Sequence, residues 1–397
     1  RSTSWASLAP AARLIAVTDS GTHMGEVPVF RSDRAAGSDQ PIHLTGLRKS
    51  ATVRTDIYLQ ETSGAPANVT IDLLDASGAA AATPRAVALA PFEMAEVFDV
   101  ATPPAVTAVV TPLGTGGGRV VAYARVSDES SGDTWSLSDW ARVSRFTTSE
   151  AVRIPYVNGR QSSSGGGRRR AVTHGQSTQS RTEVTLFNPA ATELRARLQL
   201  VEAGGGTVSR EITVAPRQTT ILSDAGSNAA TPTASLIIEP VGSGQVVATA
   251  RSHHGAAGTA IPIVPAAAGL RVGQSQRFPN LSDSSAESVA ASRPGTFRTS
   301  FGFVETAGSA VTVRARLYLD GGRELVTAII YRDYTLSPGQ QIIADQLVRS
   351  IIGAGRDNLG ELHGLQLQIE VVSGGGAVVP FVIVTENATG DTLLRLE

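Results

Sequence analysis

The chain has 397 residues, a formal net charge of −1 at pH 7 and no cysteine. The near-neutral charge provides no field that would draw the protein to nucleic acid. The absence of cysteine excludes disulfides, zinc ribbons and cysteine nucleophiles. No apolar run reaches about 18 residues, so the sequence predicts no membrane span.

The first predicted element is a strand that begins with Arg-Thr and occurs three times. The copies begin at Arg54, Arg181 and Arg298, which sets a repeat of roughly 120 residues. In each copy polar and apolar residues alternate, and this period-2 pattern predicts a half-buried strand.

Further strands follow in the same order in each repeat. Next come a second alternating strand, a glycine turn, a strand that ends at Ala-Pro or Ser-Pro, and a hairpin around a glycine-rich turn. Glycine permits the positive φ that tight hairpins need, and proline fits a strand end. A leading strand completes each repeat, at residues 27–30, 152–156 and 272–278. About seven short strands per repeat predict an antiparallel sandwich.

We therefore predict an all-β protein of three tandem antiparallel, immunoglobulin-like β-sandwich domains. The predicted domains are residues 18–147, 148–266 and 267–397, preceded by an N-terminal segment, residues 1–17. The third domain is expected to carry one short helix at residues 343–352, where apolar residues recur at helical spacing. Because a unit of this size can bury its own core, we expect the sandwiches to behave as beads on a string.

These features resemble a loosely defined group, the immunoglobulin-like or fibronectin-like repeats of secreted bacterial surface proteins and protease C-terminal regions. The resemblance is carried by the Arg-Thr-Asp strand, the Asp-Ala-Ser-Gly turn at residues 75–78, the Ala-Pro strand ends and Val-Val-Ala-Tyr-Ala-Arg at residues 120–125. The third repeat departs most, with Pro380 and Ile383 in place of Ala and Arg. The resemblance implies an extracellular or cell-surface location and a structural or accessory role, without an active site or a cofactor.

A search for chemistry yields few candidates. G-x-S-x-G, H-E-x-x-H and the phosphate-binding loop do not occur, so we assign no catalytic residue and predict no enzyme. Asp128, Glu129 and Asp133 cluster in one predicted turn, and such oxygens suit Ca²⁺, although acidic turns also form simply because they solvate and bend. His253 and His254 occupy the corresponding place in the second repeat, where a two-histidine metal site competes with a plain polar loop.

The sequence thus favours a non-enzymatic structural or adhesion protein, a subunit of a homo-oligomeric surface assembly or filament. The apolar run at residues 392–396 is expected to be an unpaired strand that another chain can pair with. Residues 1–17 are open to two interpretations, an exchanged strand or a segment that folds back on its own sandwich.

The alternative is an accessory region, with carbohydrate as a ligand, of a larger secreted hydrolase. That function requires an aromatic platform, and aromatic residues make up only 5% of the chain. Trp135 and Trp140 either stack on a sugar or pack within or between domains.

Overall fold

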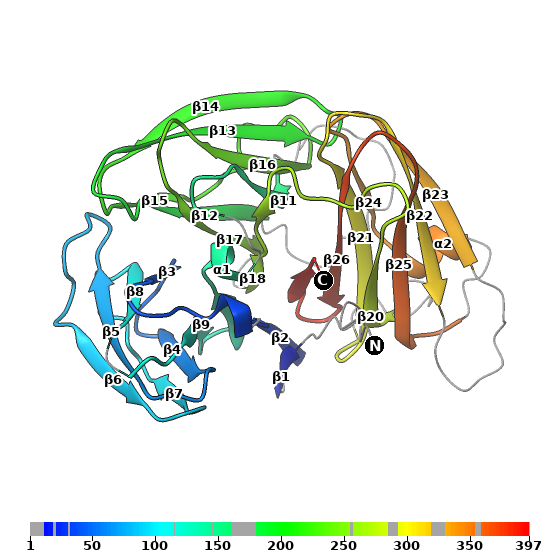
Figure 1. Ribbon diagram of the computed structural model, residues 1–397. Coiled ribbons are helices and arrows are strands. Elements are labelled where there is room, and N and C mark those ends of the chain that lie inside the picture. Colours follow the sequence, from blue (N-terminus) through cyan, green and yellow to red (C-terminus); the bar gives the residue numbers. More distant parts are fainter. Residues whose placement is uncertain are drawn as a thin grey trace, which may run out of the picture.

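The structure is a computed structural model, and it describes residues 12–18, 21–30, 32–114, 116–143, 147–159, 180–254, 257–284, 293–318, 330–353 and 359–396. Strands dominate these residues and every strand pairing is antiparallel, which confirms the predicted all-β fold. Six of the sheets combine into three sandwiches placed along an arc (Figure 1).

Eight strands form the first sandwich: β3 (Ile42–Thr45), β4 (Val53–Glu61), β5 (Ala67–Leu74), β6 (Arg85–Leu89), β7 (Met94–Val97), β8 (Thr107–Pro112), β9 (Val120–Asp128) and β10 (Asp133–Leu137). One sheet has the order β3-β8-β5-β6 and the other the order β10-β9-β4-β7. A 3₁₀ turn, η1 (Ser32–Arg34), precedes them, and a short helix, α1 (Trp140–Val143), follows them.

The second sandwich repeats this plan with β11 (Val152–Asn158), β12 (Arg181–Phe187), β13 (Leu194–Glu202), β14 (Thr207–Val214), β15 (Thr219–Leu222), β16 (Thr233–Pro240), β17 (Val247–His254) and β18 (Ala257–Ile261). Its sheets have the orders β15-β12-β17-β18 and β14-β13-β16-β11, the latter extended by β19 (Val264–Pro265).

The third sandwich consists of β20 (Ser275–Asp283), β21 (Phe297–Glu305), β22 (Val311–Tyr318), β23 (Ile330–Leu336), β24 (Gln341–Ala344), β25 (Leu362–Gly374), β26 (Val378–Glu386) and β27 (Thr392–Arg395). Its sheet orders, β20-β25-β22-β23 and β24-β21-β26-β27, match those of the other two. The three sandwiches therefore share eight strands in one topology, to which the second adds β19, where the sequence predicted about seven.

Two of the predicted elements differ from the structure. Residues 27–30 do not form the leading strand of the first sandwich. That strand is β3, because Ile42 and Leu44 alternate into the core at 2% and 0% exposure. The helix of the third sandwich, α2 (Leu347–Ile352), is shorter than predicted, since Ile343 belongs to β24 and pairs with Gly302.

The strand opening that the three repeats share has a structural reason. Its threonines, Thr55, Thr182 and Thr299, are fully buried. The hydroxyl of Thr55 donates to the carbonyl of Arg48 (2.7 Å), and that of Thr299 donates to the carbonyl of Ser282 (2.6 Å). The hydroxyl of Thr182 accepts from the last backbone N–H of β11 at 2.8 Å. Each threonine thus fastens the segment that enters its strand.

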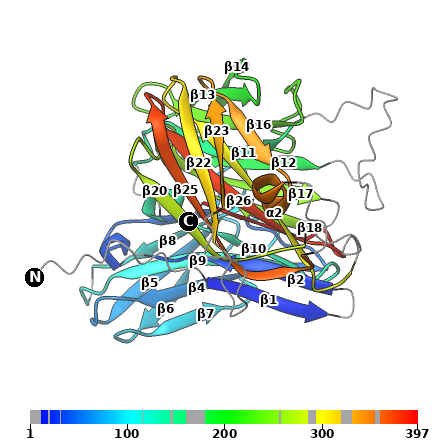
Figure 2. The same ribbon diagram turned by 90° about the vertical axis from the view of Figure 1, so that its right-hand side faces the viewer.

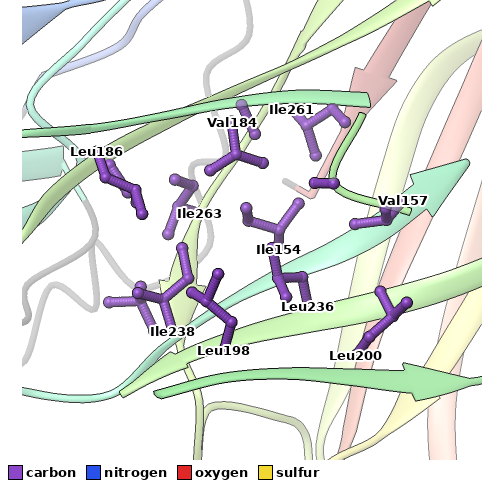
Figure 3. Packing of buried hydrophobic residues seen from close by; sticks show 14 of the residues in the cluster. Ile154, Val157, Val184, Leu186, Leu198, Leu200, Leu236, Ile238, Ile261 and Ile263 are labelled. Atoms are coloured by element: carbon purple, nitrogen blue, oxygen red, sulfur yellow. The ribbon is translucent and has the colours of Figure 1, made fainter. Parts of the chain in front are cut away.

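The core of each sandwich lies between its two sheets. In the second sandwich, Leu198 and Ile238 from one sheet meet Val184 and Leu186 from the other (Figure 3). The same apolar cluster continues into the third sandwich through Val304, Phe381 and Leu394. Each sandwich thus has a core between its sheets, and buried side chains also join the cores of the second and third sandwiches, which the sequence did not predict.

Successive sandwiches are joined by one repeated contact. The turn after the third strand, which we call the docking turn (residues 75–78 and 202–205), meets the fifth strand of the next sandwich, which we call the receiving edge (β15 and β24). Thr219 N donates to the carbonyl of Ala76 at 3.0 Å, and Gln341 N donates to the carbonyl of Ala203 at 3.2 Å. The two inter-sandwich joints are therefore built in the same way.

Both ends of the described chain are paired internally. β27 pairs with β26, and Leu393 and Leu394 are buried, so the prediction of an unpaired C-terminal strand is wrong. β1 (Ala12–Thr18) and β2 (Gly21–Val27) form a hairpin, which pairs residues 12–17 within their own chain. The rest of the predicted N-terminal segment, residues 1–11, lies outside the described residues.

The last strand of each sandwich faces the inside of the arc. β18 packs between β10 and β27, and β2 packs against both β10 and β27. The four strands thereby form a closed ring of contacts at the centre of the molecule (Figures 1 and 2). The hairpin fills the fourth place in this ring.

Candidate functional site

The side chains of the three acidic residues proposed for calcium contact three different partners. Asp128 accepts hydrogen bonds from the backbone N–H (2.9 Å) and the hydroxyl (2.6 Å) of Ser130, within its own turn. Glu129 is exposed and pairs with Arg54 at 2.6 Å. Asp133 is fully buried at the start of β10. The turn is therefore held by its own hydrogen bonds, and the structure does not bring the three carboxylates together.

Asp133 belongs instead to a junction between the first and second sandwiches. Its carboxylate receives a hydrogen bond from the guanidinium of Arg251, with Oδ2 and Nη2 2.8 Å apart. The guanidinium lies over the ring of Trp135, 3.3 Å from its centroid. Burial lowers the pKa of Arg251, and the charge of Asp133 opposes that shift. A buried cation is thus held between a carboxylate and an aromatic face.

The third sandwich contributes the equivalent residue, Asp391, to the same junction. Its carboxylate accepts from the backbone N–H of Met24 (2.5 Å), on the hairpin, and from that of Thr392 (2.9 Å). Burial raises the pKa of Asp391, and the nearby charge of Asp133 raises it further, to about 7. Arg251 and Asp133 therefore join the first and second sandwiches, and Asp391 joins the third sandwich to the hairpin.

The two tryptophans pack inside the molecule. Trp135 is 4% exposed and belongs to the core of the first sandwich. Trp140, on α1, packs against the core of the second sandwich. Packing within and between domains is therefore confirmed over stacking on a sugar.

The histidine pair does not form a metal cluster in the described part of the chain. His253 is buried, and its Nε2 lies 4.0 Å from Glu183 Oε2, while the side chain of His254 lies outside the description. Glu183 also pairs with Arg48 of the first sandwich. Among the described residues no group of three or more His, Cys, Asp or Glu side chains is placed to hold a metal ion. The interpretation as a polar loop is also wrong, because His253 and His254 belong to β17 and His253 pairs with Gly258 of β18.

A polar cleft of about 700 Å³ lies between the second and third sandwiches. Most lining side chains carry hydroxyl or amide groups, and the charged ones among the described residues are Arg298 and Asp345. Burial lowers the pKa of Arg298, although the charges of Asp345, Asp283 and Glu386 oppose the shift. The described lining thus offers hydroxyl, amide and two oppositely charged groups to a polar molecule.

Sequence reasoning missed the cleft and the junction. Arg298 opens the third Arg-Thr strand, but the motif gave no indication that its guanidinium enters a cleft. Asp133 was singled out for calcium, and its partner Arg251 is 118 positions away along the chain. A shared signal did exist, since Asp133 and Asp391 both follow a glycine at the start of the last strand of their repeat.

Comparison with known proteins adds no assignment. No family model matches the chain, and no curated protein matches it. Within the described residues, no helix is long and apolar enough to cross a membrane. Arguments about function therefore rest on the three sandwiches, their joints and the cleft.

Proposed function

We propose that this chain is a non-enzymatic structural protein, a subunit of an extracellular surface assembly. The observation that carries the proposal is the repeated joint between sandwiches. A chain that only strings domains together needs no buried contacts between them, and interfaces within such chains are small and polar. Here both joints share one hydrogen-bonded contact, and apolar side chains continue from one core into the next.

The first joint shows how closely the parts fit. Leu74 and Val109 of the first sandwich and Phe187 and Val247 of the second form a buried apolar cluster. Beside it, the hydroxyls of Thr107 and Thr219 lie 3.0 Å apart. Buried apolar contacts of this kind stabilise a fixed angle between domains, which suits a load-carrying or spacing role.

The junction groups support the same function. Asp133 and Arg251 are engaged with each other, and Asp391 is engaged with the hairpin. All three are buried, so a substrate has no direct access to them. Their chemistry holds sandwiches together.

Electron microscopy of material isolated from its natural source, with antibodies against this chain, tests the proposal. We expect labelled filaments or ordered layers on the outer surface, with a three-lobed arc as the smallest visible unit. Labelled protein found only as dispersed particles, or only inside the cell, would contradict the proposed function.

A second function, as a carbohydrate-binding accessory region, is favoured by one observation, the polar cleft between the second and third sandwiches. A panel of soluble polysaccharides, measured by affinity electrophoresis, separates the two functions. If the rival is correct, a retarded band returns to normal mobility in Arg298→Ala but not in Arg195→Ala, whose exposed side chain pairs with Glu211. Unretarded wild-type protein across the panel favours the structural function.

A further inference from the structure

The first sandwich has a receiving edge of its own, β7. It is the fifth strand, as β15 and β24 are, and it follows the same proline turn. Met94 pairs with Gln60, just as Thr219 pairs with Phe187 and Gln341 with Val304. Met94 is thus the counterpart of the two residues whose N–H groups bind a docking turn.

The direction of this N–H follows from the register. Glu61 N donates to the carbonyl of Glu93, so the next pair, Gln60 and Met94, is one that does not exchange backbone hydrogen bonds. The N–H of Met94 therefore points away from β4, toward the outer side of the edge. An N–H group in this position is a template for pairing with another chain.

The side chains around β7 are unlike those of an ordinary solvated edge. Phe92, Met94 and Phe98 are 67%, 65% and 63% exposed, and no other large apolar side chain in the described chain is more exposed. On the receiving edges, Ile221 and Ile343 line the clefts against the preceding sandwich, and their counterpart on β7 is Glu96. The exposed apolar side chains of the first sandwich thus lie beside Met94, and a contiguous exposed apolar patch is typical of a surface that contacts another chain.

We infer that β7, with Phe92 and Phe98, is a docking surface for a second copy of this chain, which approaches with a docking turn. The chain already builds an interface of this kind twice, between its own sandwiches, and a second copy would continue it. The two described docking turns are engaged within the chain. In the third repeat the sequence Asp320-Gly321-Gly322 follows the equivalent strand, β22, and these three residues lie outside the described part of the chain. The inference rests on the proposed function, and it identifies the contact between neighbouring copies in the proposed assembly.

Such a contact is head-to-tail, so each copy offers a turn at one end and an edge at the other. Heterologous contacts of this kind build an open filament, or a ring if the rotation closes. The same physical features that join sandwiches within the chain then join one chain to the next.

Sedimentation of the full chain over a range of concentrations tests the surface. We expect wild-type protein to grow beyond its 41.1 kDa monomer as concentration rises, and Met94→Pro to remain monomeric. Proline removes the outward N–H, and an edge strand tolerates it because no ladder bond is lost. Met94→Lys is the second variant, and Val208→Lys, at an exposed site on β14, is the matched control that should associate as wild type does.

Mixing Met94→Lys protein with wild-type protein tests whether the contact between copies is head-to-tail. Met94→Lys leaves the sequence of residues 320–322 unchanged, so small amounts of this variant should bind to wild-type edges and lower the mean mass of the assemblies. Wild-type protein that stays monomeric, edge variants that associate like wild type, or a mixture whose mass follows simple dilution would each overturn the inference. If filaments were seen in native material alongside any of these results, the proposed function would remain supported, but the copies would have to contact each other through another surface.

Discussion

Glu61 shows at the scale of one residue how the turns of a sandwich are fixed. Its carboxylate accepts hydrogen bonds from the backbone N–H groups of Gly64 (2.8 Å), Phe92 (3.0 Å) and Arg119 (3.1 Å), which belong to three different turns. Glu305 occupies the same position in the third sandwich and collects amides from the corresponding turns. One buried acceptor thus fixes one end of the sandwich.

Replacing Glu61 with alanine should cost about 3 kcal/mol of unfolding free energy, because buried N–H groups lose a charged acceptor. Urea denaturation measures this loss. The control is Glu129→Ala, which removes a surface ion pair with Arg54 and should cost less than about 1 kcal/mol. Equal losses of unfolding free energy for the two variants would contradict the prediction that the buried acceptor stabilises the protein more than the surface ion pair does.

The stabilisation that Glu61 contributes decreases at low pH. Burial by itself raises the pKa of Glu61, but the hydrogen bonds from Phe92, Ser63 and Gly64 outweigh burial and hold the pKa at about 2. Because the folded pKa lies below the ordinary value of 4.5, the stabilisation is complete above that value and is lost as the pH falls toward 2.

The contribution of Asp391 to stability depends on pH in the opposite direction, since its pKa of about 7 in the folded protein lies above the ordinary 3.8. The folded protein retains a proton that the unfolded chain releases, so the contribution of Asp391 to the free energy of unfolding is largest below the ordinary pKa and falls as the pH rises to about 7. Asp391→Asn should remove a fall on the order of 2 kcal/mol between these limits. Urea denaturation at the two pH values measures it. Asp75→Asn, whose carboxyl pKa is lowered, should leave the fall intact.

At the scale of elements, the docking turns depend on glycine. Gly78 has φ +84°, and a Cβ there would lie 2.5 Å from the carbonyl oxygen of Arg217 in the next sandwich. Gly205 is its counterpart, with φ +88° and a corresponding distance of 3.1 Å to the carbonyl oxygen of Pro338. A side chain at either position therefore meets backbone that cannot move independently of the neighbouring sandwich.

Thermal unfolding of three glycine-to-alanine variants separates backbone strain from the contact. Gly242 has φ +71° with nothing within 4 Å, so Gly242→Ala should cost only about 1 kcal/mol for the left-handed backbone. Gly205→Ala should cost more and Gly78→Ala the most, by roughly a further 1–3 kcal/mol for overpacking. A Gly78→Ala variant as stable as Gly242→Ala would mean that the joint is loose.

Sequence reasoning predicted the elements that depend on local pattern. The alternating Arg-Thr strands, the proline turns and the glycine hairpins were readable because period-2 burial and positive φ leave local signals. β24 could not be predicted from the sequence, because Ile343 fits a helical spacing and a four-residue strand is too short to show a period-2 pattern. The joints were not readable either, since Ala76 and Thr219 meet through backbone atoms, and backbone contacts between distant segments impose no residue type.

The whole molecule depends on the junction between sandwiches, in which Asp133 and Arg251 form a buried pair. Asp133→Asn leaves the buried guanidinium without its counter-charge and should cost about 3 kcal/mol. The matched control is Asp333→Asn, since Asp333 pairs with Arg314 at 2.7 Å on the surface, and its loss should stay below about 1 kcal/mol. Calorimetry checks both, and similar melting temperatures for the two variants would refute a stabilising junction.

The central claim is that the three sandwiches form one fixed arc rather than a flexible string. Small-angle X-ray scattering of the monomeric Met94→Pro protein tests it most directly. The account predicts a single curve that the arc reproduces, with a radius of gyration that does not change with salt, and an increase in that radius when Gly78→Ala and Asp133→Asn are added. A wild-type-like curve that requires an ensemble of independently oriented sandwiches, unchanged by those two substitutions, would contradict the account.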